Sequence, residues 1–148
     1  MRRLFNPYRL AAVVLVLNLL GHSFGALINT PDFGSESLRI AAIMKSEHFQ
    51  AQGFDVTWYG FYEGFGWFVS LFLAFSAWLA WTLGGWTAEF RRRLSAITLP
   101  LLLSYVVDLV IVWKYFFPPP IIFTTIVVVL LGIGYWQDRR AVPAAGSP

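Results

Sequence analysis

The stretch FYEGFGWFVSLFLAFSAW, Phe61–Trp78, decides the fold of this chain. Seventeen of its eighteen residues are uncharged, and the exception, Glu63, stands near its start. A helix needs roughly 20 mostly apolar residues to cross a bilayer, and the apolar character extends here from Thr57 to Leu83. The stretch therefore predicts a membrane-spanning helix, and it raises the question of what a carboxylate does inside one.

The composition of the whole chain agrees with a membrane protein. Of its 148 residues, 57% are hydrophobic and 13% are charged, whereas a soluble domain carries about 25% charged residues. The chain has no cysteine, which excludes disulfides, thiolate metal sites and a cysteine nucleophile. The net charge of +3 does not indicate nucleic-acid binding, because the basic residues lie at the ends of apolar segments.

Four segments are long and apolar enough to span a bilayer. Backbone polar groups in lipid must be paired within the segment, so the segments are predicted to be helices. The sequence predicts an all-α, four-helix transmembrane bundle over residues 1–140, with a disordered tail at 141–148. Pro118, Pro119 and Pro120 predict a tight corner before the last span. The spans are Tyr8–Asn29, Thr57–Leu83, Ser95–Phe117 and Ile121–Tyr135, the last extending to Gln137.

The basic residues predict the orientation of the bundle. Eight of the 11 basic residues lie before or at the start of the first span, between the second and third, and after the fourth. The positive-inside rule therefore places both termini in the cytoplasm of a multi-pass protein, in a bacterial inner (plasma) membrane. A second interpretation of the N-terminal residues is a cleaved signal peptide, since a basic start precedes an apolar core and small residues near Ser23 and Gly25.

The long first loop, Thr30–Val56, is predicted to face outward. The sequence SESLRIAAIMKSEHF, Ser35–Phe49, has helical character. One side of this helix carries Leu38, Ala41, Ala42 and Lys45, and another carries Ile40, Ile43 and Met44. We expect a short amphipathic helix there, lying on the outer membrane surface. Trp58, Tyr59 and Tyr62 then enter the membrane as an aromatic belt.

Three titratable side chains lie at a similar depth on three different spans. At about 1.5 Å per residue, His22 lies about 21 Å above the inner start of its span, Glu63 about 9 Å below the outer start of its span, and Asp108 about 13 Å below the outer end of its span. In a hydrocarbon core about 30 Å thick, all three fall in the outer half. Ionisable groups at this depth are costly and usually face protein or a water-filled cavity. Lys114 is expected to extend to the surface instead.

Helical spacing places polar and small residues beside each of these groups. Asn18 shares a face with His22, Tyr59 and Ser70 share one with Glu63, and Tyr105 shares one with Asp108. The predicted ligand-binding residues are therefore His22, Glu63, Asp108, Asn18, Tyr59, Ser70 and Tyr105. Small residues at a spacing of four let helices approach closely, and the predicted packing glycines are Gly21, Gly25, Gly60, Gly64 and Gly66.

Several functions are compatible with this pattern. The first is a protein that binds a lipid-like or hydrophobic small molecule in an outer-leaflet polar pocket. The second is a small membrane enzyme that uses His22, Glu63 and Asp108 as acid and base, and the third is a structural subunit of a membrane complex or a homo-oligomer. The simplest alternative for either carboxyl is a hydrogen bond between helices. No metal-ligand spacing is present, and neither a metal nor a cofactor is expected.

Two stretches resemble a family of small four-helix bacterial integral membrane proteins. GHSFGAL begins at Gly21, and MKSEHFQAQGFDVTWYGFYEGFGWFVSLFL runs from Met44 to Leu73. The family shows a Gly-His-Ser/Thr start and an FYxGFG motif, and an acid of the family is replaced here by Gly60. The resemblance implies four spans and a role for His22, and it implies no activity. The matching positions are Gly21, His22, Met44, Phe49, Gly53, Phe61, Tyr62, Gly64, Phe65, Gly66 and Ser70.

Overall fold

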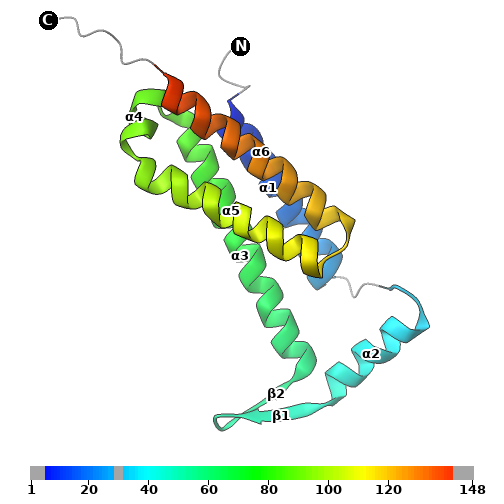
Figure 1. The fold of residues 1–148 in the computed structure, drawn as a ribbon. Coiled ribbons are helices and arrows are strands. Elements are labelled where there is room, and N and C mark those ends of the chain that lie inside the picture. The colour runs from blue at the N-terminus through cyan, green and yellow to red at the C-terminus, as the bar shows by residue number, and fades with distance from the viewer. Residues whose placement is uncertain (1–5, 29–31, 142–148) are drawn as a thin grey trace, which may run out of the picture. The chain divides into compact units, whose positions relative to one another are not determined.

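A computed structural model describes residues 6–28 and 32–141, and the fold is mostly helical (Figure 1). Within these residues, four helices are long and apolar enough to cross a membrane, as a multi-pass membrane protein requires. This confirms the four predicted spans. The predicted tail, 141–148, lies outside the described residues except for Ala141. The spanning helices are Pro7–Gly25, Trp58–Gly85, Ser95–Tyr115 and Pro118–Arg140.

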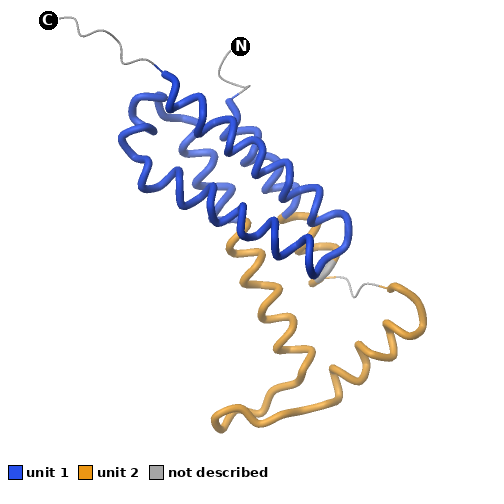
Figure 2. Tube along the Cα trace, in the orientation of Figure 1, with its two compact units in different colours: residues 1–18, 74–148 blue, residues 19–73 orange. Residues whose placement is uncertain are grey.

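The chain forms two compact units (Figure 2). Unit 1 contains residues 1–18 and 74–148, and unit 2 contains residues 19–73. Helix α1 (Pro7–His22) and helix α3 (Trp58–Gly85) each contribute residues to both units. Unit 1 also contains α4 (Ala88–Arg93), α5 (Ser95–Tyr115) and α6 (Pro118–Arg140).

The core of unit 1 is built from helix faces with a spacing of three and four residues. On α1 the buried residues are Tyr8, Ala11, Ala12 and Leu15. Small residues such as these alanines let helix backbones approach closely where no water drives association. The matching buried residues of the other helices are Ser76, Ala77, Ala80 and Leu83 on α3, Thr98, Leu101, Tyr105 and Val112 on α5, and Thr124, Val127, Leu131, Gly134 and Asp138 on α6.

The sequence predicts that Pro118, Pro119 and Pro120 precede the last helix. This prediction is wrong, because the three prolines form the first turn of that helix. Helix α6 begins at Pro118, whereas the sequence predicts a start at Ile121. The backbone N–H groups of a first helical turn have no intrahelical partner, and the fixed φ of proline suits a helix start. The connection from α5 is therefore only Phe116 and Phe117.

Between α3 and α5 the arginine run forms a short helix that the sequence analysis did not predict. Helix α3 ends at Gly85, and α4 starts after Thr87, whose hydroxyl accepts a hydrogen bond from the backbone N–H of Phe90 at 3.2 Å. A threonine at this position pairs one of the N–H groups that a helix start leaves unpaired. The chain turns here within a few residues.

Unit 2 contains the helix expected in the first loop and an unexpected hairpin. Helix α2 spans Ser35–Ser46, and none of its residues is buried. Strands β1 (His48–Ala51) and β2 (Phe54–Thr57) follow and pair antiparallel, His48 opposite Thr57 and Ala51 opposite Phe54. A two-residue turn joins them, with Gln52 at φ 51° and Gly53 at φ 88°. These are the positive φ values that a tight hairpin turn requires.

On α2, Arg39 donates hydrogen bonds to the carboxylate of Glu36 at 2.6 and 3.0 Å. These bonds lower the pKa of Glu36. The small contribution of the ionised Glu36 to helix stability is therefore complete above the ordinary pKa of a glutamate, and it is lost as the pH falls through the lowered pKa. Arg39→Gln is expected to return the pKa of Glu36 to its ordinary range. An NMR titration of the Glu36 carboxyl measures this, and an unchanged pKa in the variant would contradict the pairing.

Candidate functional site

His22 lies at the junction between a regular helix and a widened one. Helix α1 ends at His22, and a π-helix follows over Ser23–Ile28. The Nε2 atom of His22 lies 3.0 Å from the carbonyl oxygen of Gly66 on α3. A carbonyl only accepts, so Nε2 carries the hydrogen and donates it, and in a neutral imidazole Nδ1 is then left as an acceptor.

The π-helix continues the contact with α3 in unit 2. Ser23 and Ser70 share a hydrogen bond between their hydroxyl oxygens at 2.9 Å. The side chain of Leu27 lies over Gly66, where an added Cβ would stand 2.3 Å from Leu27 Cδ2. π-helical turns are rare and occur frequently at functional sites. The two segments thus meet through one histidine, one pair of serines and one glycine.

Glu63 lies on the same face of α3, one turn before Gly66. Its side chain is half-buried. Within the described part of the chain, no hydrogen bond or ion pair of this carboxylate is found. A half-buried carboxylate normally has a partner, because desolvation without one is costly. Glu63 is therefore a half-buried carboxylate without a partner among residues 6–28 and 32–141.

Two aromatic residues share this face, four residues before and after Glu63. Tyr59 is half-buried, and the ammonium of Lys45 from α2 lies 4.5 Å from the centroid of its ring. Trp67 is 48% exposed. Tyr59 and Trp67 therefore add two aromatic rings to the face of α3 that carries Glu63.

The remaining predicted site residues belong to unit 1. Asp108 is half-buried and accepts a hydrogen bond from the hydroxyl of Thr124 at 3.2 Å, which ties α5 to α6. Tyr105 is fully buried beside Ser76, and Asn18 is half-buried. Asp108 thus makes a hydrogen bond between two helices, which is the simplest alternative that the sequence analysis gives for a carboxyl. A common site that combines these residues with His22 and Glu63 stays a prediction.

The closest helix contacts involve one of the predicted packing glycines and two others. Gly66 faces Leu27, while an added Cβ at Gly21, Gly25 or Gly64 would meet no atom within 4 Å in the described chain. At Gly60 the nearest atom is the hydroxyl oxygen of Thr57, 3.1 Å away. In unit 1, an added Cβ at Gly84 would lie 2.5 Å from Arg9 Cγ, and one at Gly134 would lie 2.8 Å from the ring of Tyr8.

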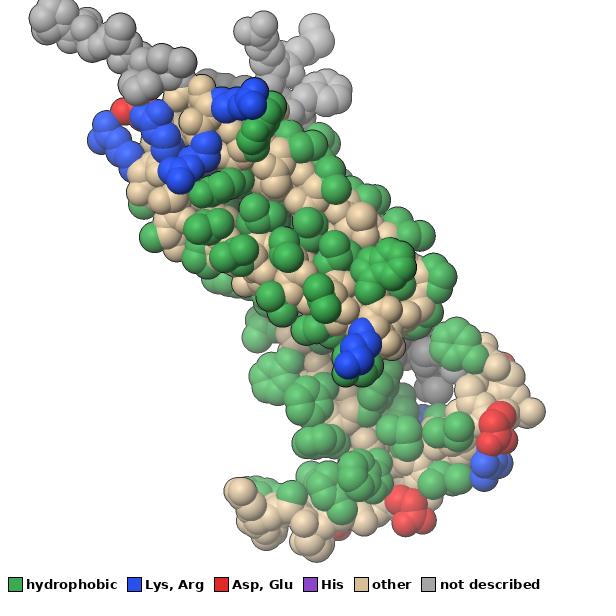
Figure 3. Space-filling model, in the orientation of Figure 1, with side chains coloured by type: hydrophobic (Ala, Val, Ile, Leu, Met, Phe, Trp, Pro, Cys, Tyr) green, Lys and Arg blue, Asp and Glu red, His purple; other side chains and the backbone are tan. Residues whose placement is uncertain are grey.

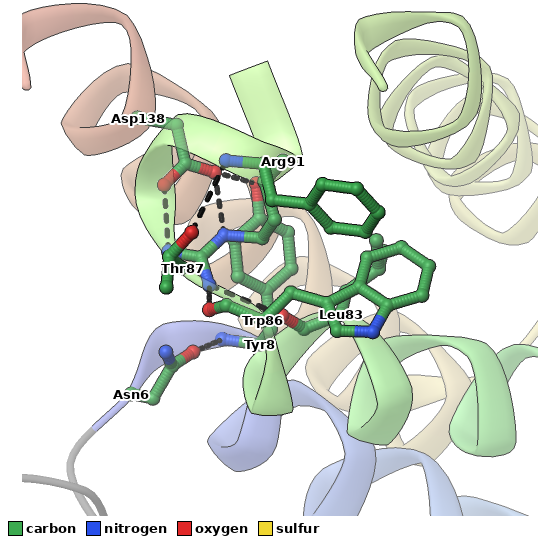
Figure 4. A network of polar contacts seen from close by, with 8 residues as sticks. Asn6, Tyr8, Leu83, Trp86, Thr87, Arg91 and Asp138 are labelled. Carbon is green, nitrogen blue, oxygen red and sulfur yellow. Dashed lines mark hydrogen bonds and ion pairs between the residues drawn. The ribbon is translucent and has the colours of Figure 1, made fainter. Parts of the chain in front are cut away.

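Unit 1 also contains a buried polar cluster that the sequence analysis did not predict (Figure 4). The guanidinium of Arg91 donates to both carboxylate oxygens of Asp138, from Nε at 2.8 Å and from Nη2 at 2.7 Å. The hydroxyl of Tyr8 donates to the same carboxylate at 2.9 Å, and its ring lies 5.0 Å from the Arg91 guanidinium carbon. We call Tyr8, Arg91 and Asp138 the Arg91 clasp.

The Arg91 clasp also closes the end of α3. The Nη1 atom of Arg91 donates to the carbonyl oxygens of Leu83, at 3.1 Å, and of Trp86. The last carbonyls of a helix have no intrahelical partner, and a basic side chain can pair them. Since all three guanidinium nitrogens of Arg91 and both oxygens of Asp138 are engaged within the chain, the clasp is a structural joint between α1, α3, α4 and α6.

A sequence signal for the clasp exists on α6. Thr124, Val127, Leu131, Gly134 and Asp138 follow one another at intervals of three and four, and all are buried. Asp138 therefore continues the buried face of α6, although it stands beside two exposed arginines. The sequence analysis assigned Arg91 to membrane topology alone, but its side chain is only 9% exposed.

Within residues 6–28 and 32–141, no three His, Asp or Glu side chains cluster as metal ligands would. No family model, no curated protein and no solved structure matches this chain. The resemblance of its motifs to the four-helix bacterial family therefore stays a prediction.

Proposed function

We propose that this chain is a multi-pass protein of a bacterial inner membrane with both termini in the cytoplasm. The distribution of basic residues supports this orientation. In it, α2 and the hairpin lie on the outer side, and α2 rests on the membrane surface. The exposed apolar side chains of α2 support its placement, because no residue of the helix is buried in the protein. These side chains are Leu38, Ile40 and Ile43.

In this orientation, we propose that the protein binds a lipid-like or hydrophobic small molecule beside Glu63 and His22, in the outer leaflet. The observation that carries the proposal is the half-buried Glu63, which has no partner in the described chain and lies one turn from the contact of His22 with Gly66. Binding sites of this kind combine an apolar wall with a few polar groups that fix the orientation of the ligand.

The chemistry of the two side chains narrows the ligand class. An ionised Glu63 only accepts hydrogen bonds, and His22 presents Nδ1 as an acceptor while Nε2 is engaged with Gly66. The polar head of the ligand must therefore donate, as an amine or a hydroxyl does. The rest of the molecule contacts lipid and the aromatic rings of Tyr59 and Trp67. The ligand is thus an amphiphile with a hydrogen-bond-donating head.

Glu63→Gln is expected to release this ligand. Glutamine keeps the size of the side chain but replaces the negative charge with an amide, so a charge-assisted hydrogen bond of about 1.5–3 kcal/mol is lost. This corresponds to roughly 10- to 150-fold weaker binding. The full chain is purified in mild detergent, and the small molecules that remain with it are identified and quantified by mass spectrometry.

Glu47→Gln is the matched control, because Glu47 is an exposed carboxylate of the same unit. We expect this variant to retain the ligand of the natural chain in the same amount. Equal retention by Glu63→Gln would contradict the proposal. A chain that carries no amphiphile but co-purifies with another membrane protein would instead favour the structural-subunit function.

A further inference from the structure

Arginine side chains gather at one end of unit 1 (Figure 3). The start of α1 and the end of α6 meet at this end, because Tyr8 and Asp138 share a hydrogen bond. Two of the arginines there are paired with acids: Arg91 with the buried Asp138, and Arg93 with the exposed Glu89 at 2.6 Å. The described chain offers no carboxylate partner to the others, which we call the cationic end: Arg9, Arg92, Arg139 and Arg140.

Arg9 points most directly to an external anion. Its stem packs on Gly84, and its guanidinium carbon lies 5.0 Å from the centroid of the Trp81 ring. Its Nε atom is buried, and no hydrogen-bond acceptor for it is found among the described residues. A buried guanidinium nitrogen without an acceptor is costly, and an anion on the same guanidinium group offsets part of that cost.

The surroundings of the cationic end match a membrane interface rather than open solution. Arg140 lies over the ring of Trp136 with its guanidinium carbon 3.8 Å from the centroid, and Arg139 lies over Tyr135 at 5.6 Å. Tryptophan and tyrosine concentrate at the headgroup level of bilayers. Both pairs lie in the last turns of α6, a helix long and apolar enough to span a membrane.

From these observations we infer that the cationic end binds the phosphate of an anionic phospholipid. Arginine suits this ligand, because its planar guanidinium donates two parallel hydrogen bonds to one phosphate. The lipid headgroup is favoured over free phosphate because Arg9, Arg139 and Arg140 stand at the ends of helices long and apolar enough to span a membrane. An anionic leaflet supplies many phosphates at once at such an end.

The inference is tested with the full chain in a neutral detergent. Phosphatidylglycerol is added, and bound lipid is counted by native mass spectrometry; phosphatidylcholine and millimolar inorganic phosphate are the comparison ligands. We expect phosphatidylglycerol to bind in preference to phosphatidylcholine. Arg139→Gln/Arg140→Gln and Arg9→Gln are expected to weaken this binding roughly fivefold for each arginine removed.

Arg39→Gln is the control, since Arg39 is an exposed arginine of unit 2, paired with Glu36. Its affinity for phosphatidylglycerol is expected to equal that of the natural chain. Because Arg139 and Arg140 are exposed, their double variant is expected to fold normally and keeps the test decisive if Arg9→Gln disturbs packing. Equal binding of both lipids, unchanged affinity in the double variant, or displacement of the lipid by inorganic phosphate would overturn the inference.

Discussion

Replacing Asp138 by asparagine is expected to lower the free energy of unfolding by about 3 kcal/mol. The asparagine keeps the shape of the side chain, but it leaves the buried guanidinium of Arg91 without a counter-charge. Asp138 is 4% exposed and holds Arg91 through two hydrogen bonds and Tyr8 through a third. Denaturant unfolding of the full chain in detergent micelles measures the change.

The exposed pair of Arg93 and Glu89 provides the control for this prediction. Its N–O distance of 2.6 Å is as short as that of the clasp, but the two side chains are 74% and 51% exposed. Exposed ion pairs contribute about 0–1 kcal/mol, so Glu89→Gln is expected to change the free energy of unfolding by less than about 1 kcal/mol. Equal effects of Asp138→Asn and Glu89→Gln would show that burial of the clasp does not determine its contribution.

Gly134→Ala is expected to destabilise unit 1 by about 1–3 kcal/mol. An added Cβ would lie 2.8 to 3.1 Å from three carbons of the Tyr8 ring. This ring cannot move aside easily, because it is 1% exposed, its hydroxyl is bound to Asp138 and the Arg91 guanidinium lies over it. The loss of stability comes from displacing the Arg91 clasp.

Gly132→Ala, two residues earlier on the same helix, is the matched control. An added Cβ there would meet no described atom within 4 Å, and alanine favours the helix over glycine by about 0.5–1 kcal/mol. The variant is therefore expected to be as stable as the natural chain or slightly more stable. Thermal unfolding of both variants in one detergent checks the pair, and similar loss in both would contradict a specific contact with Tyr8.

The spans could be predicted because a membrane imposes a simple rule on length and hydrophobicity. Each apolar segment of about 20 residues is a helix, and α3 ends two residues after the predicted end of its span at Leu83. The start of α6 was predicted three residues too late, since the proline run was taken as a break before the helix although prolines fit its first turn. Proline fits the first turn of a helix, but it cannot continue a helix beyond its last turn. A proline run between two spans can therefore belong to the start of the second helix.

The hairpin and the π-helix lay beyond the reach of the sequence analysis for different reasons. The hairpin turn uses Gln52-Gly53, which lacks the asparagine or aspartate that usually marks such turns. The π-helix could not be predicted because no residue type specifies such a helix. Its contacts with α3, through Ser23 and Leu27, appear only in the folded chain.

The candidate site stays a prediction, and the hydrogen-bond partners of its residues could not be read from the sequence. The face that Glu63 shares with Gly66 follows from helical spacing, whereas the depth of Glu63 and His22 in a membrane stays a prediction. That His22 donates to a backbone carbonyl could not be predicted, because helical carbonyls are ordinarily engaged within the helix. The Arg91 clasp was missed because charges at span ends usually indicate topology, and burial is a property of the packed helices.

The central claim is that Glu63 and His22 act together on one ligand, and a double-mutant cycle tests it most directly. His22→Gln preserves a donor for Gly66 and removes the second ring nitrogen, while Glu63→Gln removes the charge. The amount of amphiphile retained per chain is measured by mass spectrometry for the natural chain, both single variants and the double variant. The proposal predicts that each single variant loses most of the ligand. It also predicts that the double variant retains as much ligand as the single variant that retains less, because the second substitution adds no further loss. Retention of the natural amount by either single variant would contradict it.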